Sequence, residues 1–149
     1  MDKKVLENKL ESLRKCLARI ANKTPRDVVS LQRDVDVQDI LVLNLERSVQ
    51  VCVDIATHLL ADTDVPAPTT MIDTFDVLAH MKMITMATAI RMQKAVGFRN
   101  LAVHEYDKLN WNIVYKIVTK HLDDFRRFSQ QVYRYVQRKK PTRQRRLKR

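Results

Sequence analysis

Residues 36–61 have the sequence DVQDILVLNLERSVQVCVDIATHLLA. Apolar side chains recur there every three or four positions, which predicts one long helix from about Asp36 to Ala61. This helix is apolar around much of its circumference, so it needs packing partners on more than one face. In a chain this short, another copy of the chain is a natural second partner. The stretch therefore predicts a helical protein that forms a homodimer.

Four further segments have the same helical period. The chain has one glycine and four prolines in 149 residues, which leaves few sites for the tight turns that several strands need. We therefore expect an all-α antiparallel bundle of about five helices. The four further segments are residues 6–20, 70–81, about 85–106 and about 110–135.

The positive charge is concentrated at the C-terminal end. The formal net charge is +11, and residues 138–149 contain eight Lys and Arg and no Asp or Glu. Such a segment is too polar to pack, so we expect one helical domain in residues 1–137 and a disordered basic tail in residues 138–149. Two roles for the tail stay open. It attracts nucleic acid or an acidic protein, or it only solubilises the chain.

The cysteines and the apolar runs bear on metal binding and location. Cys16 and Cys52 have no CxxC spacing, so neither a zinc site nor a disulfide framework is indicated. The N-terminus lacks the apolar core of a signal peptide, and no apolar run approaches the roughly 18 residues of a membrane span. We expect a cytoplasmic protein with reduced thiols, no metal and no membrane contact.

Residues 97–106, GFRNLAVHEY, concentrate the side chains that carry chemistry. Gly97 is the only glycine, and glycine in a helix costs about 1 kcal/mol relative to alanine, so something is expected to approach the backbone there. Arg99 can hold a phosphate with two parallel hydrogen bonds, and His104 can move a proton near neutral pH. Asn100 lies one turn before His104 on the same side, whereas Arg99 is displaced by about 140°. Two copies facing each other would supply a separate acid and base.

A polar stripe crosses the long predicted helix, where Asp54 and His58 lie among apolar residues. Burial of such groups is costly without partners. We hypothesise that Asp54 pairs with Arg99 or orients His104. His58 is then a buried structural histidine or part of the same network. For Glu46, on the same stripe, a solvated position is expected.

Each of these residues also has a purely structural interpretation. An Arg/His pair on a helix is more often a surface group bonded to a neighbouring helix than a catalyst. Gly97 alone would indicate close helix packing or a bend, and Tyr106 alone a core residue with an exposed hydroxyl. The sequence has no Gly-rich phosphate loop, GxSxG motif, catalytic carboxylate pair or zinc signature, which excludes most enzyme classes.

The spacing of Arg99, His104 and Tyr106 resembles the RX4HXY motif of HepT-type HEPN toxins. The resemblance covers most of the chain, from the first helix to about Tyr135. It is carried by several segments besides the motif. These are residues 46–50, 52–59, 73–78 and 97–100.

The resemblance implies a HEPN-like homodimer that acts as the toxin of a type VII toxin–antitoxin system. It implies a metal-independent RNA endonuclease without a cofactor, in which Arg99 and His104 of both protomers form a composite site at the dimer interface. Arg99 would hold the scissile phosphate, and His104 would act on the 2′-hydroxyl or the leaving oxygen. Asn100 would support this cleft, with Asp54 as the further supporting residue of our hypothesis.

The resemblance also implies a partner that silences the toxin. In this family the antitoxin is a minimal nucleotidyltransferase of the MntA type, which transfers AMP to the motif tyrosine, here Tyr106. A second function stays open, in which the domain binds nucleotide or substrate for a nucleotidyltransferase and cuts nothing. A third is a scaffold in which the Arg/His pair ties helices together. The complete motif favours the nuclease, because a binding module has no need of all three residues.

Overall fold

The computed structural model describes residues 1–147, with side chains through residue 139. Over these residues the chain forms seven α-helices, one short 3-10 helix and no strand, which confirms the all-α class. The elements are α1 (Lys3–Lys23), α2 (Val28–Arg33), α3 (Val35–Ala61), α4 (Met71–His80), α5 (Met86–His104), η1 (Tyr106–Lys108), α6 (Trp111–Lys120) and α7 (Leu122–Leu147).

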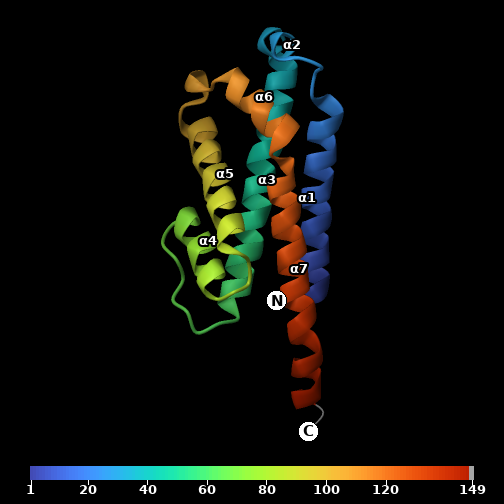
Figure 1. Ribbon diagram of the computed structural model, residues 1–149, viewed down its shortest axis with the longest axis vertical. Coiled ribbons are helices and arrows are strands. Elements are labelled where there is room, and N and C mark those ends of the chain that lie inside the picture. The colour runs from blue at the N-terminus through green and yellow to red at the C-terminus, as the bar shows by residue number, and fades with distance from the viewer. Residues whose placement is uncertain (148–149) are drawn as a thin grey trace.

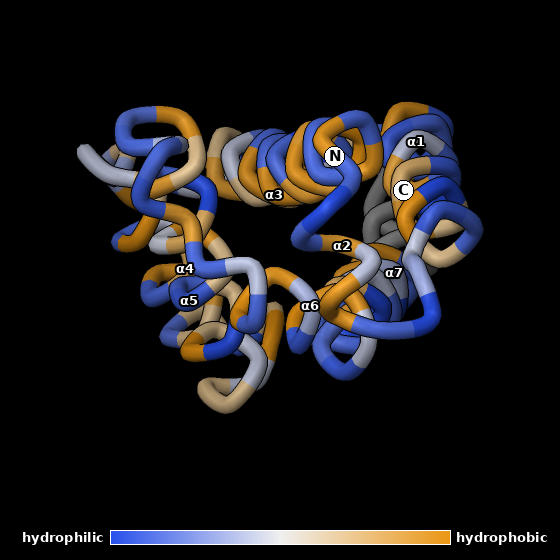
Figure 2. The backbone as a smooth tube through the Cα atoms, turned by 90° about the horizontal axis from the view of Figure 1, so that it is seen from above, coloured by the Kyte–Doolittle hydropathy of each residue, from blue (hydrophilic) through white to orange (hydrophobic). Residues whose placement is uncertain are grey.

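The long helices α1, α3, α5 and α7 run along the longest axis of the molecule (Figure 1). Seen from above, they surround a common interior, and hydrophobic and hydrophilic residues alternate along each helix (Figure 2). That alternation is the pattern of helices with one face in a shared core. Within residues 1–147, no helix has both the length and the apolar character that crossing a membrane would require.

The helices that carry the site residues begin at side-chain caps. Asp34 accepts a hydrogen bond from the backbone N–H of Val37, and Thr85 accepts one from Thr88. Caps of this kind satisfy first-turn N–H groups that have no partner within the helix, and each contributes about 1 kcal/mol. The long helix predicted from about Asp36 to Ala61 is confirmed, with its first residue at Val35.

The prediction of about five helices is wrong in number. The six residues of α2 are too few to show a helical period, and the predicted last helix is divided into α6 and α7 at His121. The guanidinium of Arg91 on α5 holds this junction, because it donates to Nδ1 of His121 at 2.5 Å and to the carboxylate of Asp124 at 3.1 Å. Contacts between residues so far apart in sequence leave no mark on local periodicity.

The last helix covers most of the predicted tail. In the structure α7 continues to Leu147, and its final part extends beyond the ends of the other helices (Figure 1). Residues 148–149 lie outside the described part of the chain. Helical segments outside a packed core are only marginally stable in water, so the disorder of residues 138–149 and the domain boundary after residue 137 stay predictions.

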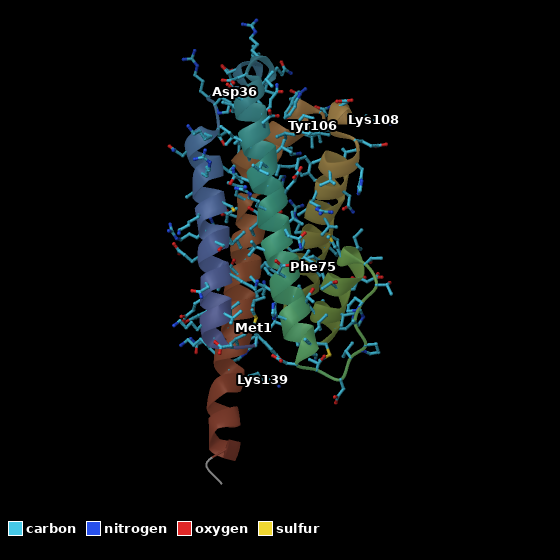
Figure 3. All side chains as sticks on the ribbon, turned by 180° about the vertical axis from the view of Figure 1, so that it is seen from behind. Met1, Asp36, Phe75, Tyr106, Lys108 and Lys139 are labelled. Carbon is cyan, nitrogen blue, oxygen red and sulfur yellow. The ribbon has the colours of Figure 1, made fainter. Side chains whose placement is uncertain are left out.

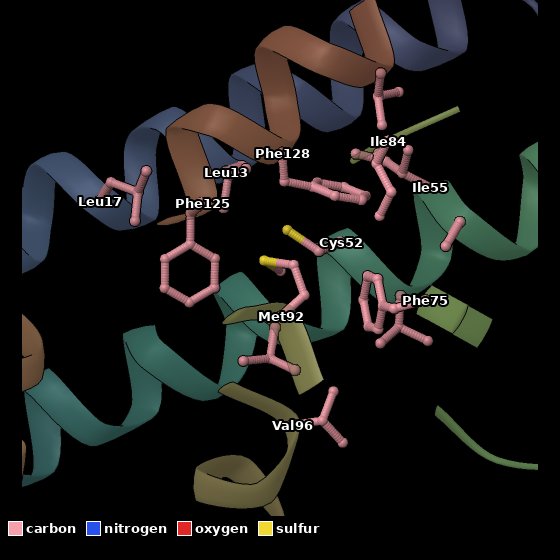
Figure 4. Close-up of a cluster of buried hydrophobic side chains, with 14 of the residues drawn as sticks. Leu13, Leu17, Cys52, Ile55, Phe75, Ile84, Met92, Val96, Phe125 and Phe128 are labelled. Carbon is pink, nitrogen blue, oxygen red and sulfur yellow. The ribbon is translucent and has the colours of Figure 1, made fainter. Parts of the chain in front are cut away.

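The core is built around α3. This helix contacts α1, α4, α5 and α7, so the partners that its apolar circumference requires lie within the same chain. Our argument that α3 needs a second copy is therefore wrong, and a dimer must be argued from another surface. Close to Cys52 of α3, the rings of Phe75 and Phe128 meet edge to face, with centroids 5.7 Å apart (Figure 4).

We expect Phe128→Ala to lower the free energy of unfolding by about 3–5 kcal/mol, because Phe128 is fully buried and its removal leaves a cavity beside Phe75. Urea denaturation followed by circular dichroism measures the loss. Ile113→Ala, at a side chain that is 55% exposed, is the control and should change the free energy little. Equal losses for the two variants would contradict this account of the core.

Candidate functional site

The site is positioned by the antiparallel packing of α3 against α5. Two pairs of residues define the register of the two segments. The hydroxyl of Tyr106, just after α5, bonds Asp39 of α3, and the charge of Arg99 acts on Glu46. Asp39 and Glu46 are seven residues apart, as are Arg99 and Tyr106, so the two segments run in step. The polar groups of the motif therefore face the first half of α3.

Arg99 is half-buried between these two helices. One of its guanidinium nitrogens donates to the side-chain oxygen of Asn100 at 3.2 Å. Burial raises the pKa of the half-buried Glu46 carboxyl, and the nearby positive charge of Arg99 opposes that rise. Glu46 is thus not the solvated residue that the sequence predicts. Its carboxyl lies within reach of the charge of Arg99, and among the side chains described no ion pair joins the two.

The structure does not bring Asp54 to the motif. Asp54 accepts a hydrogen bond from Gln50 of its own helix at 3.0 Å, and the side chains described here include no bond from it to Arg99 or His104. The reason is the register, since Asp54 lies eight residues beyond Glu46, roughly 12 Å further along α3. The expected pairing is therefore wrong within one chain. His58 is exposed, so the prediction of a buried structural histidine is also wrong.

His104 is the last residue of α5, and its side chain is exposed. Among residues 1–139, whose side chains are described, none donates to or accepts from its ring. Both ring nitrogens are therefore open to a ligand. Asn100 precedes it by one turn on the same face of the helix. One chain thus presents a single proton-transfer group near a single guanidinium.

Tyr106 lies at the start of η1, at the end of the molecule where α3 begins (Figure 3). Its hydroxyl donates to Oδ1 of Asp39 at 2.6 Å, and its ring meets Trp111 edge to face at 6.1 Å. Burial raises the pKa of the Tyr106 hydroxyl well above its ordinary value, and the bond and charge of Asp39 raise it further. A tyrosine hydroxyl is protonated at neutral pH in any case, so these effects only hold the proton of Tyr106 more firmly, although the residue is 36% exposed.

Gly97 lies on the outside of α5 with open space around it. A Cβ atom placed there would have nothing of this chain within 4 Å. Close helix packing within the chain, one of the two structural interpretations of this glycine, is therefore wrong. If the backbone is approached at Gly97, the approaching group belongs to another molecule.

Sequence reasoning did not single out Asp39, and it gave Glu46 no role at the site. Asp39 and Glu46 lie on the long helix among other polar residues, so residue type alone does not distinguish them from residues without a role at the site. A usable signal was the spacing of seven that they share with Arg99 and Tyr106. It becomes visible only when α3 and α5 are known to be antiparallel neighbours.

The part of the chain that contains these residues is similar to known proteins. The family described as ribonuclease HepT-like matches residues 10–132. The mRNA nuclease HepT of Shewanella oneidensis is 36% identical over 124 residues, which are 83% of this chain and 92% of that protein.

Solved structures extend the comparison to the fold. A tri-AMPylated HEPN toxin of Shewanella oneidensis, in complex with an MNT antitoxin, has a TM-score of 0.82 at 34% identity and covers 89% of this chain and 98% of its own. A chain from a toxin–antitoxin complex with AMP-PNP has the same TM-score at 33% identity, covering 87% of this chain and 98% of that one. The resemblance inferred from the motif is confirmed. By sequence and by fold, the chain belongs to the HepT-like ribonuclease family.

Proposed function

We propose that this chain is the ribonuclease toxin of a toxin–antitoxin pair and that it cuts RNA in the cytoplasm with Arg99 and His104. The observation that carries the proposal is the exposed ring of His104 at the end of α5, on the face of Asn100 and near the guanidinium of Arg99. The relative named as an mRNA nuclease supports RNA as the substrate. A binding module would not need an exposed histidine with both ring nitrogens open.

The catalytic unit that we propose is a homodimer. Met86, Ile90, Gly97 and His104 lie within about 40° of one another around α5. Met86 and Ile90 are 46% and 47% exposed, and Gly97 leaves room for another backbone. Exposed apolar side chains at one end of this face and a glycine near its middle suit close approach of a second helix. We place the dimer interface there, because it would bring the two copies of His104 toward the symmetry axis.

Two protomers would supply the groups that RNA cleavage needs. One His104 takes the proton of the ribose 2′-hydroxyl, whose oxygen attacks the phosphorus, and the other protonates the leaving 5′-oxygen. The two Arg99 guanidiniums hold the phosphate and stabilise its added negative charge. The products are a 2′,3′-cyclic phosphate and a free 5′-hydroxyl. In this scheme the protein side chains carry every proton transfer, and no metal is required.

The partner that we propose is a nucleotidyltransferase antitoxin of the MntA type that transfers AMP to Tyr106. Support comes from the AMPylated HEPN toxin in complex with an MNT antitoxin. Tyr106 follows His104 by two residues, and its side chain is 36% exposed, so its hydroxyl lies near the surface. AMP units there would place negative charge and bulk where the RNA phosphate must bind.

The basic end of the chain provides a second surface for RNA. Lys82, Arg134 and Arg138 line a cavity of about 440 Å³ beside the start of α5. The 19-residue helix α5 separates this cavity from His104 by roughly 27 Å. The basic segment 138–149 begins with one of these lining residues, Arg138. We propose that this surface holds the RNA backbone away from the cleavage point.

His104→Ala should abolish RNA cleavage by the purified dimer, because the proton-transfer group is lost. Cleavage of a labelled RNA in the presence of EDTA, with the 2′,3′-cyclic product identified by mass, is the measurement. His80→Ala is the matched control, since His80 is exposed near the other end of the molecule and should leave the rate unchanged. Persistent cleavage by the His104 variant would assign the activity to another site.

Gly97→Leu should weaken the dimer at least tenfold and reduce cleavage in proportion, because a leucine side chain would fill the space reserved for the partner helix. The chain itself should fold normally, since a Cβ atom at Gly97 meets nothing. Sedimentation equilibrium gives the dissociation constant. Ala18→Leu, at an exposed position of α1, is the control. An unchanged dimer in the Gly97 variant would move the interface elsewhere.

Deleting residues 138–149 should lower RNA affinity and flatten its dependence on salt, because each lost phosphate contact reduces the slope of log K against log salt by about 0.7 for single strands. Fluorescence anisotropy with a labelled, uncleavable RNA measures both. The triple variant Lys15→Gln, Arg19→Gln, Lys23→Gln removes charge from α1 and is the control. An unchanged affinity and slope after the deletion would leave the tail without a role in RNA binding.

A further inference from the structure

The Asp39 carboxylate and the Tyr106 hydroxyl form a short contact that the nuclease chemistry does not use. The oxygens are 2.6 Å apart, the range of a hydrogen bond from a hydroxyl to an ionised acceptor. The two residues come from different elements, 67 positions apart in sequence. Trp111 packs against the tyrosine ring and so limits where the hydroxyl can point. The contact is therefore a consequence of the tertiary fold and not of proximity in the sequence.

We propose that Asp39 is the general base for the modification of Tyr106, so that the toxin supplies a catalytic group for its own inactivation. This inference rests on the proposed function, in which Tyr106 receives AMP. The transferase would then bring the nucleoside triphosphate, and this chain would bring the nucleophile with its base already in contact.

The proposed step transfers AMP from ATP to the hydroxyl oxygen of Tyr106. The Tyr106 hydroxyl oxygen attacks the α-phosphorus of ATP and forms a new phosphodiester bond. The bond from that phosphorus to the oxygen shared with the β-phosphate breaks, and pyrophosphate leaves with the electron pair. The hydroxyl proton passes to Oδ1 of Asp39 and from there to solvent. An aspartate has the same task in protein kinases, where it accepts the proton of the substrate hydroxyl.

A base is needed because the hydroxyl is not ionised beforehand. A tyrosine is protonated at neutral pH, and burial and the neighbouring carboxylates raise the pKa of Tyr106 further, so the phenolate is scarce. The proton must then leave during the attack. A carboxylate that is already hydrogen-bonded can accept it without rearrangement.

Two other carboxylates near Tyr106 are engaged elsewhere. Glu46 is half-buried within reach of the charge of Arg99, and Glu105 forms an ion pair with Lys108 at 3.3 Å. Among the side chains described, Asp39 is the acceptor of the tyrosine hydroxyl. The geometry thus selects one residue, and Asp36, one turn earlier on α3, offers a control with the same charge.

The experiment is AMP transfer from ATP to the full-length chain by a nucleotidyltransferase antitoxin of the MntA type, followed by intact mass in single turnover. Asp39→Asn keeps a hydrogen-bond acceptor but not a base, so the rate constant at saturating toxin should fall about 10²-fold or more. Asp39→Glu should recover part of the rate. Asp36→Asn should react like the wild type, and Tyr106→Phe should gain no mass.

The AMP-transfer rates of the Asp39 variants distinguish a general base from a docking contact. Wild-type rates for Asp39→Asn would overturn it, and so would a loss confined to the toxin concentration needed for half-maximal rate, which would make Asp39 a docking contact. Thermal unfolding of the Asp39 variants checks that the chain is intact. If the wild-type chain gains no AMP, the proposed silencing of Tyr106 fails and this inference with it, whereas cleavage by Arg99 and His104 is tested separately with EDTA present.

Discussion

The antiparallel packing of α3 against α5 determines which residues of α3 lie near Arg99 and Tyr106. Asp39 of α3 accepts a hydrogen bond from Tyr106, and Glu46, seven residues later, lies within reach of the charge of Arg99, seven residues before Tyr106. The apolar contacts that maintain this register lie next to the site, where Val42 of α3, Ala102 of α5 and Leu109 are buried together. A shift of one turn between the helices would separate both polar pairs at once. The site is thus a consequence of core packing.

Within this frame the two ends of α5 differ in character. Its C-terminal end places an exposed imidazole and an exposed tyrosine near a half-buried guanidinium, with carboxylates of α3 behind them. Its N-terminal end lies beside three basic side chains around a cavity. The proposed reactive groups and the proposed phosphate contacts therefore lie at opposite ends of α5. With this arrangement, a substitution at one end of α5 would change the affinity for RNA and a substitution at the other end would change the rate of cleavage.

Much of the fold was predictable from the sequence, because a long amphipathic helix shows apolar side chains at every third or fourth position. The central helix at residues 36–61 is an example. The division at His121 was not predictable, since it depends on Arg91, thirty residues away. At the site, Arg99, His104 and Tyr106 follow from the motif. The partners of Arg99 and Tyr106 do not, because the spacing along one helix says nothing about which residue of another lies opposite. The mistaken choice of Asp54 was an error of register.

The short contact between Tyr106 of η1 and Asp39 of α3 also has a consequence for the AMPylation that we propose. An esterified tyrosine has no hydroxyl hydrogen, so it can no longer donate to Asp39. The new phosphodiester would carry negative charge toward a carboxylate, and the two would repel. The first added nucleotide would thus release the tyrosine side chain from α3 and turn it outward. The hydrogen bond to Asp39 could not form again until the phosphodiester is hydrolysed. The inactivated state would therefore persist after the antitoxin has dissociated.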